Sequence, residues 1–359
     1  MAFTDRITAD VNTRKDKYKG EQQMSELITP KDYTPVISSL ETQRAIKKIK
    51  DYFQQELAYG LNLRRVSAPL FVDPRTGLND NLSGVERRVT FTLKGLDEKE
   101  VEIVQSLAKW KRMALGKYGI KPGHGIYTDM NAIRRDEELD NLHSVYVDQW
   151  DWEKVITKDQ RNTEYLHETV TTIYNAIKNL GDYVNRLYRD LQTEIPNEIY
   201  FITTQELEDL YPNKTDKERE DLICKAHGAV FIEKIGGVLK SGKKHDDRSP
   251  DYDDWELNGD IILWNDVLEK AFEISSMGIR VDAEAMDRQL TLAGADDRRT
   301  QSFHQSILND ELPYSIGGGI GQSRLCMFFL RKAHIGEVQA SVWSDEMINE
   351  CKKHNIFLL

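Results

Sequence analysis

Cysteine is scarce in this sequence: only Cys224, Cys326 and Cys351 occur among 359 residues. Three widely separated cysteines are too few for a disulfide framework or a cysteine-rich zinc site, so we expect structural cysteines in a reducing compartment, the cytoplasm. Long apolar runs are missing as well, since none approaches the roughly 18 residues of a membrane-spanning helix. The sequence therefore predicts a cytoplasmic protein with no membrane partner.

Excess basic charge is a third absence. Lysine and arginine number 49 against 60 aspartates and glutamates, which gives a formal net charge of -11. This charge repels phosphate backbones, and no local basic patch compensates for it, so we predict no nucleic-acid partner. The N-terminus mixes Asp5, Asp10 and Asp16 with its basic residues, unlike a signal or transit peptide.

The first 37 residues differ from the rest of the chain. They have balanced charge, few large apolar residues and no periodicity, which predicts a poorly ordered extension or one that lies over the body. From Ser38 an apolar face at helical spacing predicts a helix that ends at Gly60. We therefore predict an extension over residues 1–37 and a single domain over residues 38–359.

Further elements follow from periodicity. Helices are predicted at 106–117 and 166–191, and strands at 89–93, 101–104, 143–152, 199–202, 229–232, 260–264 and 272–281. This order favours an α+β fold with a largely antiparallel sheet. In the strand 143–152, period-two spacing places Gln149 and Asp151 on one face. Because an unpaired buried carboxylate is costly, we expect that face to line a pocket.

Two segments are candidates for phosphate or metal binding. The glycine-rich run 317–321 leads into a helix that carries Arg324, a pattern of either a phosphate or carboxylate site or a plain turn with a surface arginine. Asp260 and Glu273 lie on neighbouring predicted strands, where they either share a Mg²⁺ ion or are solvated acids. Each pair of alternatives stays open on these residues alone.

Two further segments carry weaker signals. The run 237–244 nearly matches a Walker A motif, but Lys244 stands where the Ser or Thr belongs, so we predict a hairpin turn in a charged loop. Lys109, Lys111 and Arg112 cannot share one helical face, so we expect at least one of them to be solvated.

Longer motifs carry a resemblance to a known family. These are 80–84 (DNLSG), 106–112 (SLAKWKR), 142–153 (LHSVYVDQWDWE), 229–231 (AVF), 250–255 (PDYDDW), 258–260 (NGD), 275–282 (SSMGIRVD) and 317–325 (GGGIGQSRL). Together they resemble the ammonia-dependent asparagine synthetases, aspartate-ammonia ligases built on the catalytic domain of class II aminoacyl-tRNA synthetases. The resemblance implies a mostly antiparallel sheet of seven or eight strands, a homodimer, and conversion of aspartate, ATP and ammonia into asparagine, AMP and pyrophosphate through a β-aspartyl-adenylate.

The resemblance also implies roles for individual residues. Asp80 would face the side-chain end of aspartate and accept the proton of ammonium. The catalytic set would be Asp80, Lys111, Arg134, Gln149, Asp151 and Arg324, and the aspartate pocket Asp80, Ser106, Lys111, Gln149, Asp151 and Arg324. ATP or AMP would contact Arg134, His143, Ser144, Val147, Gln149, Asp253, Asp260, Glu273, Ser276 and Arg324. Asp260 and Glu273 would hold Mg²⁺.

Three alternatives are weighed against this reading. An asparaginyl- or aspartyl-tRNA synthetase-like paralogue that acts on or binds tRNA needs an anticodon-binding module, and residues 1–37 are too short and too neutral for an OB-fold. A regulatory paralogue without activity is expected to lose the reactive residues, which are all present. A glutamine-hydrolysing enzyme carries a cysteine after the initiator methionine, whereas Ala2 stands here, so ammonia is the expected nitrogen donor.

Overall fold

A large sheet forms the centre of the computed structural model, which describes residues 27–80, 82 and 86–359. Eight strands follow the order β1-β5-β6-β11-β10-β9-β8-β7. Their bounds are β1 Leu63–Arg65, β5 Gly125–Ile133, β6 Tyr146–Val155, β7 Tyr200–Thr203, β8 Ala229–Glu233, β9 Asp253–Asn265, β10 Lys270–Arg280 and β11 Ser315–Gly321. The two outermost pairs are parallel and the inner pairs antiparallel, which confirms the predicted α+β fold with a mostly antiparallel sheet.

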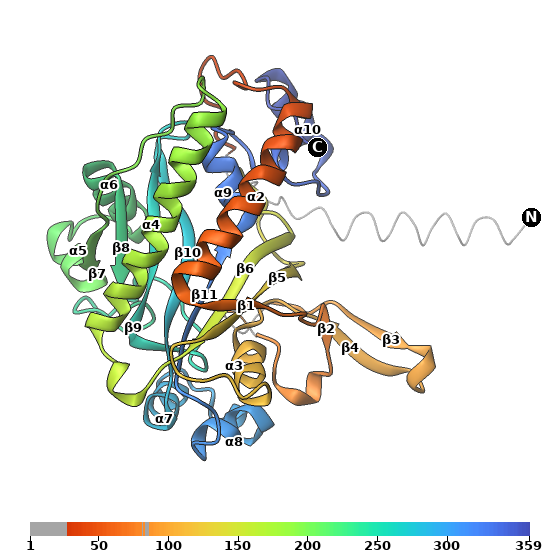
Figure 1. Cartoon of the computed structure of the whole chain (residues 1–359), viewed down its shortest axis with the longest axis vertical. Coiled ribbons are helices and arrows are strands. Elements are labelled where there is room, and N and C mark those ends of the chain that lie inside the picture. The colour runs from red at the N-terminus through yellow and green to blue at the C-terminus, as the bar shows by residue number, and fades with distance from the viewer. Residues whose placement is uncertain (1–26, 81, 83–85) are drawn as a thin grey trace, which may run out of the picture.

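Helices surround this sheet (Figure 1). They are α2 Ser39–Leu61, α3 Ala108–Lys117, α4 Thr163–Leu187, α5 Thr204–Leu210, α6 Asp216–His227, α7 Ala283–Leu292, α8 Ser302–Leu308, α9 Gln322–Phe329 and α10 Asp345–Lys353. The helices α2 and α4 lie across one face and bury Phe53 and Ile177 against Trp150 and Trp152. No helix within the described ranges is long and apolar enough to cross a membrane.

The long helix α2 shows how the local sequence sets an element. The Ser38 side chain caps its N-terminus by accepting a hydrogen bond from the Glu41 amide at 3.3 Å. The helix ends at Leu61, and its C-cap residue Asn62 has a left-handed φ of 58°. The predicted end at Gly60 is therefore early by one residue, because a left-handed cap, rather than the glycine, stops this helix.

Residues 27–37 lie against the body without forming a helix or strand. The Ile28 amide donates to Asn141 Oδ1 at 2.8 Å, and the Tyr33 hydroxyl donates to both oxygens of Glu337 at 3.0 Å. Tyr33 joins the same apolar core as residues up to Ile356. The poorly ordered extension was predicted for residues 1–37, of which residues 1–26 lie outside the described part.

A small second sheet projects from the body (Figure 1). It has the order β2-β4-β3, with bounds β2 Phe71–Val72, β3 Thr90–Leu93 and β4 Lys99–Ile103. The predicted strand at 89–93 is present as β3, but the buried face that its alternating pattern favours is absent, since three of its four residues are exposed. Phe91 packs edge to face on Phe71, and the two side chains stay 38% and 40% exposed.

The near match to Walker A is a hairpin turn, as predicted. Val238 and Lys244 form an antiparallel bridge, and the Leu239 amide donates to the Lys243 carbonyl at 2.7 Å. Gly242 has a φ of 83°, which suits a glycine in a tight turn. This hairpin belongs to the long loop between β8 and β9.

Candidate active site

A row of small and acidic residues crosses the sheet face opposite α2 and α4. The register pairs Asp151 on β6 with Gly319 on β11, Gly319 with Ser276 on β10, and Ser276 with Asp260 on β9. Directly paired residues point to the same side of a sheet, so these four side-chain positions share one face. Trp150 and Trp152 occupy the other face, which confirms the predicted alternation on β6.

The glycine-rich run is the strand β11 and not a turn, which corrects the turn alternative. A methyl group at Gly319 would overlap Gln149 Oε1, and one at Gly317 would overlap the Glu153 carboxylate. Glycine in a strand marks a place where another group approaches closely. Here the glycines make room for polar side chains of β6 that fold across the floor of the site.

A β-bulge brings Glu273 to the same face as Asp260. Ser276 pairs with Asp260 and Glu273 pairs with Ile262, with a register shift between Glu273 and Ser275. Without the extra residue, Glu273 and Ser276 would point to opposite faces, because they are three positions apart. The bulge therefore places both predicted metal-binding carboxylates at one site.

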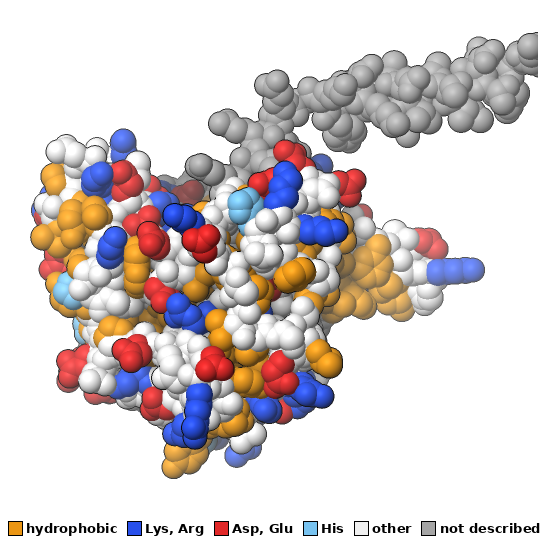
Figure 2. All heavy atoms as spheres, turned by 90° about the horizontal axis from the view of Figure 1, so that it is seen from above, with side chains coloured by type: hydrophobic (Ala, Val, Ile, Leu, Met, Phe, Trp, Pro, Cys, Tyr) orange, Lys and Arg blue, Asp and Glu red, His pale blue; other side chains and the backbone are white. Residues whose placement is uncertain are grey.

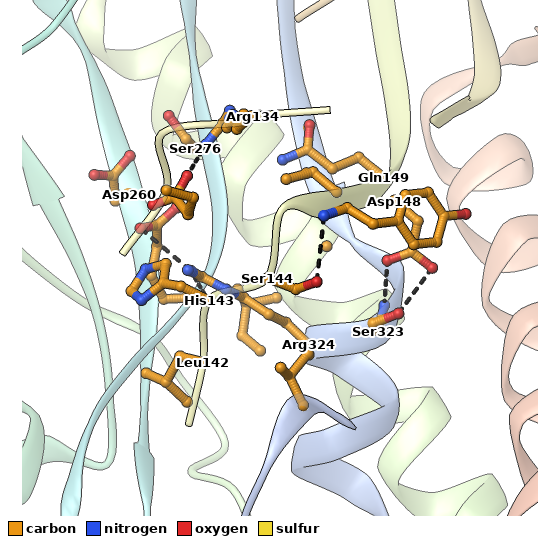
Figure 3. Close-up of a pocket in the computed structure, with 18 of the residues that line it drawn as sticks. Arg134, Leu142, His143, Ser144, Asp148, Gln149, Asp260, Ser276, Ser323 and Arg324 are labelled. Carbon is orange, nitrogen blue, oxygen red and sulfur yellow. Dashed lines mark hydrogen bonds and ion pairs between the residues drawn. The ribbon is translucent and has the colours of Figure 1, made fainter. Parts of the chain in front are cut away.

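A cleft opens over this floor, and Figure 3 labels ten of its residues. The predicted residues that line it are Arg134, His143, Ser144, Val147, Gln149, Asp260, Glu273, Ser276 and Arg324. In Figure 3, Arg324 extends from α9 across the cleft; its Nη1 lies 3.4 Å from Glu273 Oε2. Arg134 follows β5, and its buried Nε has no hydrogen-bond partner in the described part of the chain.

The electrostatics of the two cleft carboxylates differ. Burial, reinforced by the nearby negative charge of Glu273, raises the pKa of Asp260 to about 6 although Arg248 opposes the shift. For Glu273, burial opposes ionisation, but the positive charges of Arg324 and Lys217 keep the pKa below its usual value. Two acids with partly compensated charge on one face favour binding of a cation.

Lys111, Asp151 and Asp253 are buried on the same side of the sheet as the cleft but do not line it. Lys111 donates to the Asp151 carboxylate, and burial lowers the pKa of the Lys111 ammonium. Arg280 donates to Asp253 and to Glu153. These buried pairs hold α3, β6, β9 and β10 together beside the site.

The predicted solvation of at least one basic residue on α3 is wrong. Lys109, Lys111 and Arg112 are each at most 3% exposed. Lys109 pairs with Asp251 at 2.7 Å, while Arg112 donates to the Pro313 carbonyl at 3.1 Å and to that of Val281. The helix fits into the body with polar partners on several sides, so three residues on different faces are all satisfied inside the protein.

Asp80 lies beside α3, away from the cleft wall. Its Oδ1 accepts the Leu82 amide at 3.0 Å, whereas its buried Oδ2 has no partner among the described residues. Burial raises the pKa of the Asp80 carboxyl, and the positive charge of Lys109 opposes this shift. The rest of the motif 80–84 lies outside the described residues, except Leu82. Ser106 is half-buried and its hydroxyl accepts the Ala108 amide at 3.2 Å.

Sequence reasoning missed several residues near the site. Asn79 Oδ1 accepts the amides of Asp80 and Gln105 at 3.0 and 2.8 Å, which joins two segments of the chain. Gln105 is fully buried, and neither polar atom of its side chain has a partner in the described ranges. Arg248 lines the cleft and contacts Asp260. Arg248 lies two residues before the start of the motif 250–255, and this proximity was its only sequence signal.

Comparison with known proteins adds the evidence for kinship. The family model described as aspartate-ammonia ligase matches residues 40–355. The chain belongs to the aspartate-ammonia ligase family. The aspartate–ammonia ligase of Ruminiclostridium cellulolyticum is 61% identical over 336 residues, covering 94% of this chain and 100% of that protein. That of Bacillus cytotoxicus is 60% identical over 326 residues, covering 91% and 99%. These matches confirm the predicted family.

Solved structures confirm the class II synthetase fold. The asparaginyl-tRNA synthetase of Entamoeba histolytica in complex with asparaginyl-adenylate has a TM-score of 0.61 at 11% identity, covering 84% of this chain and 66% of that one. The corresponding complex from Pyrococcus horikoshii has a TM-score of 0.59 at 15% identity, covering 83% and 68%. The family member thus spans about two thirds of these synthetases, and the likeness shows the shared fold alone.

Proposed function

We propose that this protein amidates the side chain of L-aspartate with ammonia and ATP, releasing AMP and pyrophosphate. The observation that carries the proposal is the cleft that combines Arg134, Arg324, Asp260 and Glu273 over a glycine floor. Arginines bind phosphate oxygens through fixed, permanently charged N–H groups, and the glycines let a flat ligand lie on the strands. Membership of the aspartate-ammonia ligase family supports the same reaction.

The first step is activation of the substrate carboxylate. An oxygen of the aspartate β-carboxylate attacks the α-phosphorus, the bond to the β-phosphate breaks, and pyrophosphate leaves. Negative charge on the α-phosphate oxygens is stabilised by Arg134 and Arg324, with Lys111 as a further, buried cation. Gln149 and Asp151, on the same face of β6, orient the amino acid, and Ser106 adds a hydrogen bond.

The second step is attack by ammonia on the β-carbonyl carbon, which forms the C–N bond and breaks the C–O bond to AMP. The attacking nitrogen must lose a proton, and we assign its acceptance to Asp80. Burial raises the pKa of the Asp80 carboxyl, which makes its carboxylate a stronger base. Its buried Oδ2, which has no hydrogen-bond partner among the described residues, is an acceptor that an ammonium ion would satisfy.

Asp260 and Glu273 are the residues we assign to Mg²⁺. Mg²⁺ in nucleotide sites is held by one or two carboxylates together with phosphate oxygens, so two acids on one face fit this ion. Within the described residues no group of three or more His, Cys, Asp or Glu side chains could hold a metal by itself. When bound, the ion would neutralise phosphate charge. The predicted nucleotide site is completed by His143, Ser144, Val147, Ser276 and the buried Asp253.

We further propose a homodimer in the cytoplasm. The projecting small sheet exposes Phe71 and Phe91 together with Leu70 and Leu96, and Figure 2 shows hydrophobic atoms gathered on the projecting part. Exposed apolar patches of this kind are typical of protein interfaces. The three cysteines are free and buried, which suits a reducing compartment. Sedimentation of the purified protein, compared with Phe71→Ser/Phe91→Ser, tests the dimer; a wild-type monomer would refute it.

The decisive test of the reaction is a product analysis with aspartate, ATP, Mg²⁺ and ammonium. We expect asparagine, AMP and pyrophosphate in equal amounts, and exchange of labelled pyrophosphate into ATP that depends on aspartate. Formation of ADP would refute the adenylate route. The tRNA-directed alternative predicts charging of a tRNA by the same preparation, and asparagine release without tRNA would exclude it as the main activity.

A further inference from the structure

Arg248 occupies the side of Asp260 that faces the cleft. It lies in the loop between β8 and β9, and its guanidinium reaches the floor of the site. Nη2 donates to Asp260 Oδ1 at 2.6 Å, and Nη1 donates to the Ser276 hydroxyl. The Arg248 side chain is only 8% exposed. A buried guanidinium thus serves as the counter-ion of a residue assigned to metal binding.

The second carboxylate of the pair has an arginine of its own. Glu273 Oε2 lies 3.4 Å from Arg324 Nη1, and the Glu273 carbonyl accepts from the same nitrogen at 3.0 Å. Both carboxylates assigned to Mg²⁺ therefore have an arginine as counter-ion in this structure. Two carboxylates side by side without cations would repel each other, so this pairing stabilises their arrangement in the cleft.

We propose that Arg248 is a positioning residue that competes with the divalent cation for Asp260. It holds Asp260 and Ser276 in place while the cleft is free of ligand and leaves Asp260 when the cation and ATP enter together. This inference rests on the proposed function, since it assumes that Asp260 holds the cation.

The exchange conserves charge, which makes it feasible in a buried site. Asp260 exchanges its partner, the Arg248 guanidinium, for a metal ion. Arg248 exchanges its partner, the Asp260 carboxylate, for the phosphates of ATP, so neither charge is left unpaired. Arg248 does not use all of its hydrogen-bond donors, because its buried Nε has no hydrogen-bond partner within the described ranges. Its position in a loop, rather than a strand, lets the side chain move without disturbing the sheet.

The competition predicts that removing Arg248 strengthens metal binding, although most mutations in a binding site weaken it. Replacing Arg248 with methionine keeps the length of the side chain but removes the competitor and leaves Asp260 without a counter-ion. We expect Arg248→Met to bind Mn²⁺, used as a probe for Mg²⁺, about tenfold more tightly than wild type in the absence of ATP. With a saturating non-hydrolysable ATP analogue the advantage should disappear, because the analogue moves Arg248 away from Asp260 in the wild type.

The experiment is a Mn²⁺ titration of the full-length protein, followed by electron paramagnetic resonance of the free ion. Lys244→Met is the matched control: it removes one positive charge from the same loop, where Lys244 pairs with Asp247 at 3.1 Å rather than with Asp260. We expect its Mn²⁺ affinity to match wild type. Unchanged or weaker binding by folded Arg248→Met would overturn the proposal.

Two further variants separate the possible failures. Arg248→Lys keeps the positive charge but not the planar guanidinium that donates to two partners. It should give a Mn²⁺ affinity between those of wild type and Arg248→Met, and it can be measured even if Arg248→Met folds poorly. Arg248→Met/Asp260→Asn should lose the gain in Mn²⁺ affinity. If the gain persists in the double variant, Asp260 is not the ligand and the metal assignment of the proposed function fails. If asparagine forms normally but no variant changes Mn²⁺ binding, only the competition is refuted.

Discussion

Lys111 and Asp151 form a buried ion pair that joins α3 to the centre of the sheet. The Lys111 ammonium donates to the Asp151 carboxylate and to the carbonyls of Trp152 and Gly318, each at 3.0 Å. All three of its protons are therefore used, and both side chains are at most 5% exposed. The pair fixes the floor on which the cleft is built.

Breaking this pair from one side should destabilise the protein strongly. Lys111→Met leaves the Asp151 carboxylate buried without its cation, which costs about 3–5 kcal/mol. Lys111→Met/Asp151→Asn removes both charges, so we expect it to recover more than half of that loss. Urea denaturation of the single and double variants measures the coupling, and asparagine formation should be lost in all of them.

Lys117→Met is the control for this double-mutant cycle, because Lys117 is exposed at the end of the same helix. Its unfolding free energy should stay within about 0.5 kcal/mol of wild type. Strictly additive losses at Lys111 and Asp151 would show that the two residues do not depend on each other.

The glycine floor gives a second prediction, on function rather than stability. A methyl group at Gly319 overlaps Gln149 Oε1, the end of a flexible side chain, so Gly319→Ala should fold but push Gln149 out of its position. We expect kcat/KM for aspartate to fall about 100-fold, in line with the effect of small misplacements in active sites. Steady-state kinetics measure the fall in kcat/KM, and circular dichroism checks that the variant folds.

Gly237→Ala is the matched control, since nothing lies within 4 Å of a methyl group there. It should leave both the kinetics and the spectrum unchanged. Wild-type kinetics in Gly319→Ala would mean that the place of Gln149 over β11 does not matter for aspartate.

The strands and helices with regular apolar patterns could be predicted from the sequence. Trp150 and Trp152 alternate with Gln149 and Asp151, and the two sets lie on opposite faces as expected. The strand β11 could not be recognised as a strand, because its glycines carry no side-chain periodicity. Its place in the sheet depends on partners in β6 and β10 that are far away in the sequence.

The candidate site was only partly visible in the sequence for a similar reason. Asp260 and Glu273 point to the same face of the sheet because of a β-bulge, and no local sequence pattern predicts this bulge. The burial of Lys109, Lys111 and Arg112 contradicts helical periodicity because each residue finds its own polar partner in another segment. Long-range pairing, such as that of Arg248 with Asp260, follows from the fold and not from spacing.

Gln105 supports a prediction in which stability rises and activity stays the same. Its side chain is fully buried, and neither polar atom has a partner in the described part of the chain, which costs about 1–3 kcal/mol. Gln105→Met keeps the shape without the polar atoms, so its unfolding free energy should rise by about 1 kcal/mol. The hydrogen bond to Asn79 Oδ1 is donated by the backbone amide of Gln105 and remains in this variant, so kcat/KM for ammonium should match wild type.

Denaturation and ammonium titration of Gln105→Met provide the two readouts. Gln339→Met is a comparison variant: Gln339 is also buried, but its amide donates to Asp148 at 3.2 Å and Ser323 at 3.1 Å, so its loss should destabilise. A less stable Gln105→Met, or one with slower ammonium kinetics, would contradict the prediction.

His334 gives the protein a specific dependence on pH. The ring is fully buried, and its Nδ1 accepts the Gly336 amide at 3.0 Å, so the neutral form is the one that fits. Burial lowers its pKa from 6.5 to about 4. Between these values the unfolded chain binds a proton that the folded protein does not, so stability is complete above about pH 6.5 and falls as the pH drops towards 4. The loss amounts to about 3 kcal/mol.

His334→Asn can still accept from Gly336 but does not titrate, so its stability relative to wild type should improve by about that amount between pH 7 and pH 4. Urea denaturation at both pH values measures the difference, and parallel profiles of the two proteins would show that His334 is not the group responsible.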